Sequence, residues 1–411
     1  MSAVVDSQLK RVIGLPLITL YGIGTIVGAG IYVLVGKVVA SSGFHAPISF
    51  LIAALVAAFT ALSYAELAGR FPRSAGVAHY VNQAFARVWL ARLMGLAVVA
   101  TGVVSAATMT RGFVGYFQYF LMLPTEFLIV AFVALMTGLA IWGVAESLRV
   151  AALITLVEVM GILLMLVATQ SHWTRVPEDW QTFLPAFSAE HWTHIGLGAF
   201  LAFFAFIGFE DMVNMAEEVK DARRTLPRAI VIAISVTACL YMLVVWAAVN
   251  ALPLAQLSSS TAPFADLVAE SRWLPVWAIT LISLLAISNG ALIQVIMASR
   301  VFYGMSDQGL LPGWLRQVNR VTRTPVNATL VAGAAVLLFA SLLPLEALAR
   351  VTSFIILCVF CLVNLALLKI KRAEKQQPED DAGASIRYPL AVPVLGLLSA
   401  GALLAVQIVK G

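Results

Sequence analysis

Charged residues are scarce in this sequence of 411 residues, since Asp, Glu, Lys and Arg together make up only 11% of it. An ordinary soluble domain has about one quarter charged residues. Hydrophobic residues make up 61% of the chain, and the mean hydropathy is +0.95. This composition excludes a soluble globular protein and indicates an integral membrane protein.

Cysteine and histidine are also rare, with three cysteines and five histidines. Cys239, Cys358 and Cys361 lie in apolar segments, so we expect no disulfide-linked partner subunit. His191 and His194 have a ligand-like spacing, but no cysteines or carboxylates lie in register with them, and we expect no metal site. The sequence contains no Ser-His-Asp order and no phosphate-binding loop. We therefore expect no cofactor and no enzymatic activity.

Apolar segments long enough to cross a bilayer recur along the whole chain. A transmembrane helix needs about 20 mainly apolar residues, and no linker divides the sequence into soluble domains. We therefore expect one all-α transmembrane domain over residues 1–411 with about 11 transmembrane helices. The expected spans are approximately 12–40, 46–69, 93–121, 127–145, 150–170, 194–215, 229–251, 273–304, 327–344, 347–368 and 388–409.

The distribution of lysine and arginine predicts how the chain is oriented in the membrane. If successive spans cross the membrane in opposite directions, most of the 26 Lys and Arg residues fall on one side of it. Cytoplasmic loops carry this excess, so we expect a cytoplasmic N-terminus in the inner (plasma) membrane. The same bias accounts for the net charge of +5 without a nucleic-acid partner. The exceptions are Lys37, Arg175, Arg272, Arg350 and Lys410 on the opposite side and Arg111 within a span.

Four glycines interrupt the first apolar segment, residues 19–36: Gly22, Gly24, Gly28 and Gly30. A transmembrane helix tolerates such weak points only where the freed backbone groups face protein, a cavity or a ligand. An alternative interpretation is helix packing, because Gly24 and Gly28 form a G-x-x-x-G pattern. Packing explains one helix face, whereas these glycines cover several, so we predict an unwound first helix.

The sixth apolar segment has a comparable interruption at Gly208, followed at once by Glu210 and Asp211. Broken segments at corresponding positions of two halves are typical of inverted-repeat transporters, which bind substrate near the bilayer midplane. We therefore expect a LeuT-like 5+5 inverted repeat with broken helices 1 and 6. Repeat one covers about 12–170, repeat two about 194–368, and an additional helix covers 388–409.

The two breaks together predict a site for a zwitterion. Amides freed at Gly28, Ala29 and Gly30 lie at the positive end of a half-helix and suit a carboxylate. A break in the sixth segment frees carbonyl groups that suit an ammonium group. Phenylalanines beside the break line or gate the pocket, or pack in the core as most do. The candidate substrate-binding residues are Ile26, Gly28, Ala29, Gly30, Phe203, Phe204, Ala205, Phe206, Ile207 and Glu210.

Ionisable residues inside the spans are candidates for function, because charges in hydrocarbon are costly. They are Arg111, Glu158, Glu210 and Asp211. Glu158 and Glu210 are the candidates for proton coupling. The alternatives are a structural pair or a neutral hydrogen-bonded acid for Glu158, and a helix terminus or vestibule residue for Glu210.

Five motifs along the chain are recognisable: GIGTIVGAGIYVLVGKV (22–38), SYAELAGRFPRSAGVAHYV (63–81), FFAFIGFEDMVNMAEEVKDARRTLPRAI (203–230), SRVFYGMSDQGLLPGWL (299–315) and RTPVNA (323–328). Together they resemble the amino acid/polyamine/organocation (APC) transporter superfamily, most closely its bacterial cationic amino acid transporter-like branch, and they extend along nearly the whole chain in the family's order. The resemblance implies a broken-helix fold with two inverted repeats, alternating access and L-amino acid or related amine substrates. It places carboxylate-binding amides on residues 28–30 and ammonium-binding carbonyls on Phe204, Ala205 and Ile207.

The sequence departs from the family pattern in two places. Proton-coupled relatives often carry a lysine where the alignment puts Glu158, and the family commonly has twelve spans. We expect an amino acid permease with the proton as its coupling ion. A cationic amino acid or polyamine exchanger of the same fold is the alternative. A nutrient sensor or membrane enzyme is disfavoured because the loops are too short for a further module.

Overall fold

A computed structural model describes residues 11–72, 76–143, 148–173, 185, 187–216, 218–307, 309, 311–376 and 386–411. These residues are almost entirely helical, and Ile13 and Val219 form an isolated bridge. Within this part of the chain, nine helices are long and apolar enough to cross a membrane. The first of these runs, Leu15–Arg70, contains the two long helices α1 and α2 joined by the short η1, and Val326–Leu342 is a shorter apolar helix. The chain is a multi-pass, all-helical membrane protein.

The long helices are connected by short helices and turns. The elements are α1 (Leu15–Ser42), η1 (Gly43–His45), α2 (Ala46–Arg70), α3 (Gly76–Phe85), α4 (Val88–Phe117), α5 (Thr125–Trp142), α6 (Leu148–Ala168), η2 (Gln170–His172), α7 (Ala189–Ala202), η4 (Phe203–Phe206), η5 (Phe209–Met215), α8 (Ala222–Ala251), α9 (Leu254–Ser259), α10 (Pro263–Leu267), α11 (Val276–Asp307), η6 (Gly313–Arg316), α12 (Val326–Leu342), α13 (Leu345–Gln376) and α14 (Ala391–Lys410).

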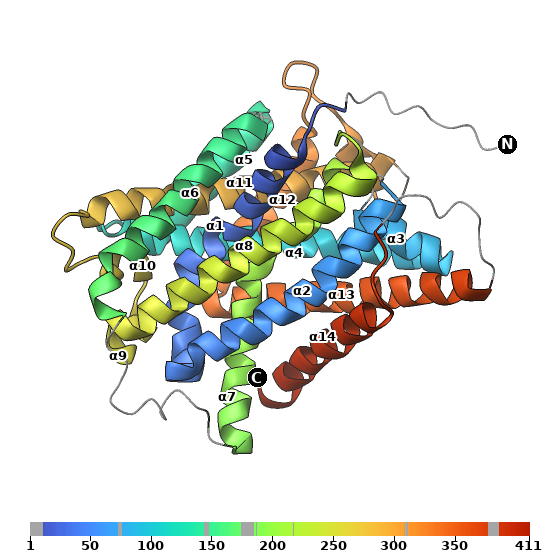
Figure 1. Cartoon of the computed structure of the whole chain (residues 1–411). Helices are drawn as coiled ribbons and strands as arrows, with labels where there is room; N and C mark the ends of the chain where they lie inside the picture. The colour runs from blue at the N-terminus through green and yellow to red at the C-terminus, as the bar shows by residue number, and fades with distance from the viewer. Residues whose placement is uncertain are drawn as a thin grey trace.

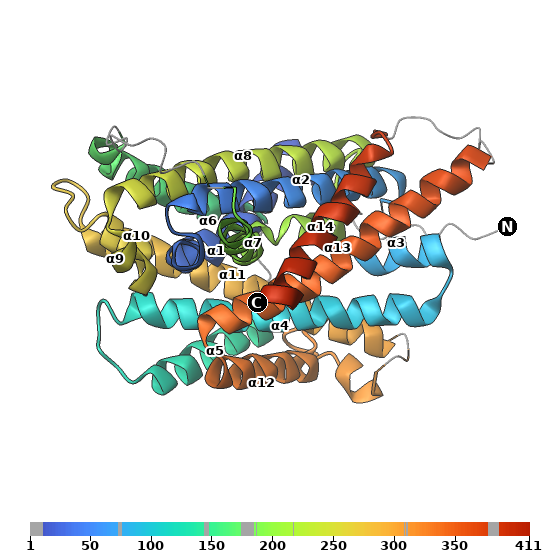
Figure 2. The same cartoon turned by 90° about the horizontal axis from the view of Figure 1, so that it is seen from below.

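The helices form layers around a central pair of segments. Figure 2 shows α8 and α2 on one side, α4, α5 and α12 on the other, and α1 with α7 between them. The most extensive packing joins α4 to α11 and α2 to α8. Helices α13 and α14 cross the bundle obliquely and pack against each other (Figures 1 and 2). The first and sixth apolar segments are therefore enclosed by the other helices.

Several helix boundaries differ from the expected spans. Helix α13 continues to Gln376, beyond the expected end at 368, because its charged last turns pair with side chains of α2. Helix α8 begins at Ala222 rather than 229 and has Pro227 inside its first turns. The short helices α3, α9 and α10 were not expected, since they are too short to cross a membrane. Arg175, which we used for the orientation, lies outside the described residues.

Candidate functional site

Helix α1 is interrupted at Gly28, at the centre of the predicted break. Its backbone angles there, φ −12° and ψ −140°, are not helical, whereas the residues on both sides continue α1. The Cα of Gly290 in α11 lies 4.0 Å from the position a Gly28 Cβ would take. The backbone of Gly30 lies against Ala205 of η4, so closely that a side chain at Gly30 would collide with the Ala205 Cα. The interruption of α1 thus faces the sixth apolar segment.

The sixth segment is interrupted at Ile207 and Gly208. Helix α7 gives way to η4, Ile207 is extended at φ −70° and ψ 140°, and η5 begins after Gly208. Gly208 has φ 129°, a conformation that side-chain-bearing residues rarely adopt. A Cβ on Gly208 would also overlap the carbonyl group of Thr25 in α1. Glycine is therefore required here for both conformation and space.

Polar contacts join the two interrupted segments directly. The Thr25 hydroxyl donates to the Gly208 carbonyl over 3.1 Å. The hydroxyl of Tyr241 in α8 lies 2.8 Å from the Ile26 carbonyl and 3.0 Å from the Ala205 carbonyl. Because a phenol has one hydrogen, the two carbonyls share it. Tyr241 thus bridges the broken regions of α1 and of the sixth segment.

The predicted ammonium-binding carbonyls already have partners in this conformation at two of three positions. The Phe204 carbonyl accepts a hydrogen bond from the Ile207 amide at 3.2 Å, and the Ala205 carbonyl accepts from Tyr241. The expectation that the Phe204 carbonyl has no helical partner was wrong, because the segment turns as a 3-10 helix. The partner of the Ala205 carbonyl is a side chain of α8, which does not test the same expectation there. A carbonyl has a second lone pair, so their role in binding stays a prediction.

The predicted pocket phenylalanines are packed against other aromatic rings. Phe203 contacts Phe360 of α13, with ring centroids 5.7 Å apart. Phe206 contacts Tyr241 at 5.1 Å and Phe50 of α2 at 6.5 Å. Phe204 and Ile26 are also buried. The side chain of Ala29 lies outside the described part of the structure.

A small cavity lies beside the interruption of the sixth segment. Its lining includes Ile207, Glu210 and Asp211 with Val77 of α3 and Gln294 of α11. Its volume is about 10 Å³, roughly enough for one water molecule. A cavity of this size has no room for a ligand larger than a water molecule, so the molecule is closed around this point.

The polar groups around this cavity are mostly hydrogen-bond acceptors. One Glu210 oxygen, Oε2, accepts the Gly208 amide over 2.9 Å. The buried Asp211 Oδ2 and Gln294 Oε1 atoms have no hydrogen-bond partner within the described residues. Buried polar atoms normally have partners, so these acceptors are suited to a ligand that brings a donor or a positive charge.

Glu158 lies in a different place, between α6, α1 and α11. Its side chain is fully buried, and Oε1 accepts a hydrogen bond from Asn289 of α11 at 3.2 Å. The hydroxyl of Tyr32 in α1 donates to the Glu158 backbone carbonyl at 2.7 Å. The two acids predicted for proton coupling, Glu158 and Glu210, therefore belong to separate environments.

A line of hydrogen bonds closes the end of the bundle that carries α9 and α10. The Tyr116 hydroxyl of α4 donates to the Tyr32 carbonyl at 2.7 Å, and the Phe264 amide of α10 donates to the Tyr116 hydroxyl at 3.2 Å. The rings of Tyr32 and Phe264 also pack, with centroids 4.4 Å apart. Lys37 donates to the Ser258 carbonyl of α9. This end is held shut by buried contacts.

Sequence reasoning missed several polar residues that hold the site together: Thr25, Tyr241, Asn289 and Gln294. Each is a polar side chain in an otherwise apolar helix, and each lies at or near one of the interruptions. The available signal was that a hydroxyl or amide in a transmembrane helix needs a partner. Arg111, the remaining charge noted within a span, donates to the Ser341 carbonyl at 3.1 Å.

Comparison with known proteins identifies the family of this chain. The amino acid permease family profile matches residues 13–411. The chain is 32% identical over 402 residues to the branched-chain amino acid permease BcaP of Bacillus subtilis (strain 168). This alignment covers 91% of this chain and 83% of that protein. It is 29% identical over 385 residues to the mitochondrial cationic amino acid transporter 3 of Arabidopsis thaliana, covering 89% of this chain and 63% of that longer protein.

A third relative, the methylthioribose transporter of Bacillus subtilis (strain 168), is 29% identical over 408 residues, with 93% of this chain and 85% of that protein covered. The family match extends over nearly the whole sequence, and these relatives align over most of it. The chain belongs to the amino acid permease family of the APC superfamily, and it is an amino acid transporter rather than an enzyme.

Proposed function

We propose that the protein is a secondary active transporter for an L-amino acid that works by alternating access. The contact between the interrupted α1 and the interrupted η4–η5 segment carries this proposal. In it, amides at residues 28–30 bind the substrate carboxylate. Carbonyls at Phe204, Ala205 and Ile207 bind its ammonium group. Broken helices inside a protein are suited to a charged ligand, because the amide and carbonyl groups at the break can form hydrogen bonds to the ligand.

In the proposed architecture eleven spans form a LeuT-like 5+5 inverted repeat. Helices α1, α2, α4, α5 and α6 make repeat one, over about 12–170. The segment α7–η5 with α8, α11, α12 and α13 makes repeat two, over about 194–368, and α14 is the additional helix at 388–409. We place the N-terminus in the cytoplasm and the protein in the inner (plasma) membrane, as the Lys and Arg distribution favours.

We propose proton coupling through Glu158 or Glu210. Purified protein reconstituted into liposomes is expected to accumulate a labelled amino acid under an inward proton gradient. Replacing Glu158 by Gln keeps the bond from Asn289 possible but removes the titratable group, and we expect it to weaken the gradient-driven accumulation. Glu346→Gln, in a partly exposed pair with Arg350, is the matched control. Gradient-independent accumulation by the unmodified protein would refute coupling but not transport.

A cationic amino acid or a polyamine is the second candidate substrate, and the protein would then work as an exchanger of the same fold. The acceptors around the small cavity, Glu210, Asp211 and Gln294, favour it because they can hold a second positive charge. A thermal-stability panel of amino acids and diamines in detergent decides between the two. Stabilisation by putrescine but by no α-amino acid favours the second candidate, and stabilisation by neutral α-amino acids alone contradicts it.

Removal of the Tyr241 hydroxyl tests whether the bridge matters for binding. Tyr241→Phe keeps the ring against Phe50 and Phe206 but leaves the Ile26 and Ala205 carbonyls without their shared donor. We expect a loss of about 1–2 kcal/mol in the stability of the empty protein and a changed KM with normal expression. Tyr119→Phe, at an exposed tyrosine, is the control. Equal KM values for Tyr241→Phe and the parent would show that the bridge has no part in binding.

A further inference from the structure

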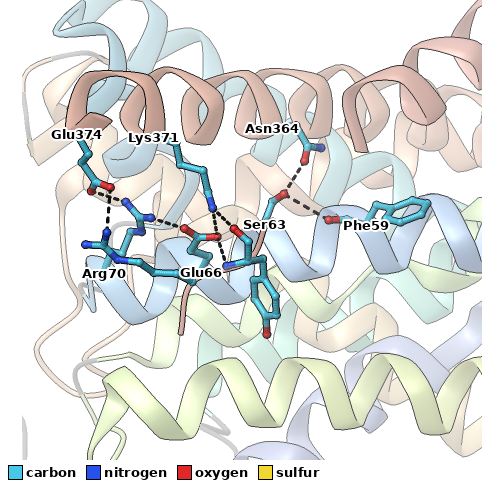
Figure 3. A network of polar contacts seen from close by, with 9 residues as sticks. Phe59, Ser63, Glu66, Arg70, Asn364, Lys371 and Glu374 are labelled. Atoms are coloured by element: carbon cyan, nitrogen blue, oxygen red, sulfur yellow. Dashed lines mark hydrogen bonds and ion pairs between the residues drawn. The ribbon is translucent and has the colours of Figure 1, made fainter. Parts of the chain in front are cut away.

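A cluster of charged side chains joins α2 to α13 at the end of the bundle near α3. Figure 3 shows Lys371 and Glu374 of α13 pointing toward Glu66 and Arg70 of α2. Glu66 is fully buried and pairs with both Arg70 and Lys371, the latter at 2.7 Å. Arg70 also pairs with Glu374. These four side chains therefore balance one another.

Next to this cluster lies a cavity of about 380 Å³ with an excess of positive charge. Four cations line it, Arg70, Lys371, Arg372 and Arg387, together with Glu374 as the one acid. The only further carboxylate in the network of ion pairs at this place is Glu66, so two positive charges remain uncompensated within the described residues.

The two uncompensated charges belong to Arg372 and Arg387. Arg372 is exposed and has no ion pair within the described residues, and Arg387 lies 3.8 Å from Glu374, the longest of the ion pairs here. Tyr388 also lines the cavity.

The cavity opens beside an apolar helix surface. Leu390 is part of its lining and is 47% exposed, and it directly precedes α14. Along α14, Leu395 and Leu398 are also exposed, with 43% and 63% of their surface accessible. An exposed leucine face on an apolar helix of this length is typical of contact with lipid chains. The basic cavity and the exposed leucines of α14 are thus adjacent, as are the headgroup and the acyl chains of a phospholipid.

We propose that this cavity binds the phosphodiester headgroup of an anionic phospholipid. Arg372 and Arg387 make charge-assisted hydrogen bonds to the phosphate oxygens, for which guanidinium groups have matching geometry. The acyl chains lie along the leucines of α14. Basic cavities between transmembrane helices are suited to such headgroups. A free phosphate ion shares the headgroup chemistry but would make no use of the leucine face.

Lipid binding to the purified full-length protein in a neutral detergent tests the proposal. Native mass spectrometry measures the retention of phosphatidylglycerol, phosphatidylcholine and added inorganic phosphate. We expect phosphatidylglycerol to bind most tightly. Arg372→Gln/Arg387→Gln is expected to weaken it about thirtyfold, which corresponds to about 1 kcal/mol for each arginine. The single variant Arg372→Gln, at a residue with no ion pair to lose, is expected to show part of this effect even if the double variant folds poorly.

The control is Arg316→Gln/Arg320→Gln, which removes two exposed arginines from another part of the chain. Equal weakening by this control would mean that only general surface charge attracts the lipid, and it would overturn the proposal. Equal binding of phosphatidylcholine and phosphatidylglycerol would also overturn it. Retention of inorganic phosphate as strong as that of phosphatidylglycerol would assign the cavity to a free anion instead.

Discussion

Gly208→Ala is expected to abolish transport, with uptake in liposomes at least tenfold below that of the parent protein. An alanine at φ 129° is strained, and its Cβ overlaps the Thr25 carbonyl, a backbone group that cannot rotate away. The strain costs about 1–3 kcal/mol, and the overlap forces α1 away from the interrupted sixth segment. Because the Thr25 and Tyr241 contacts join these two segments, we expect the proposed substrate site to lose its geometry.

The matched control for this prediction is Gly138→Ala in α5. A Cβ at Gly138 meets no atom within 4 Å, and alanine is favoured in a helix by roughly 0.5–1 kcal/mol. We expect normal uptake and unchanged or slightly raised stability for this variant. Fluorescence-detected size-exclusion chromatography separates folded from misfolded protein in both cases. Parent-like uptake by folded Gly208→Ala would contradict the importance that we give to the contact between the segments.

Glu66→Gln is expected to be the most destabilising single substitution that conserves side-chain shape. It leaves Arg70 and Lys371, which are 7% and 11% exposed, without the buried carboxylate between them. The bond that the Tyr388 amide donates to Glu66 at 3.0 Å is also weakened. Breaking a buried ion pair on one side costs about 3–5 kcal/mol. Thermal unfolding in detergent, followed by tryptophan fluorescence, measures the effect.

Two further variants give this prediction its controls. Glu346→Gln breaks a partly exposed pair with Arg350 and is expected to cost at most about 1 kcal/mol. Glu66→Gln/Lys371→Met removes one charge of each sign, so we expect it to recover part of the stability that Glu66→Gln loses. A double-mutant cycle of the two substitutions measures the coupling free energy between Glu66 and Lys371. Equal melting temperatures for Glu66→Gln and Glu346→Gln would mean that the buried pair contributes no more than an exposed one.

The positions of the helix interruptions could be predicted from sequence, because their cause is local. Gly28 and Gly208 lie in apolar segments where little else explains a glycine, and α1 and the sixth segment are interrupted there. The apolar segments similarly predicted the long helices. The ends of α8 and α13 could not be placed, because their polar extensions beyond the apolar core depend on partners from elsewhere in the chain.

The hydrogen-bond partners of the candidate site residues could not be predicted either, because they come from distant parts of the chain. Tyr241 follows Gly208 by more than thirty positions, and only the packing of α8 against α1 and η4 brings its hydroxyl to the two carbonyls. The bond from Asn289 to Glu158 likewise depends on how α11 is rotated toward α6. Apolar helices with weak periodicity leave that rotation undetermined, since most of their faces are equally hydrophobic.

The hydrogen bonds among Phe264, Tyr116, Tyr32 and Glu158 have a mechanical consequence for the helix that carries the acid. They run from α10 through α4 and α1 to the backbone of α6. If Glu158 carries the coupling proton, as we propose, a rotation of α6 that repositions its carboxyl displaces Tyr32 and, through Tyr116, the amide of Phe264 in α10. Protonation of this acid and opening of the end of the bundle that carries α9 and α10 are then coupled through four residues.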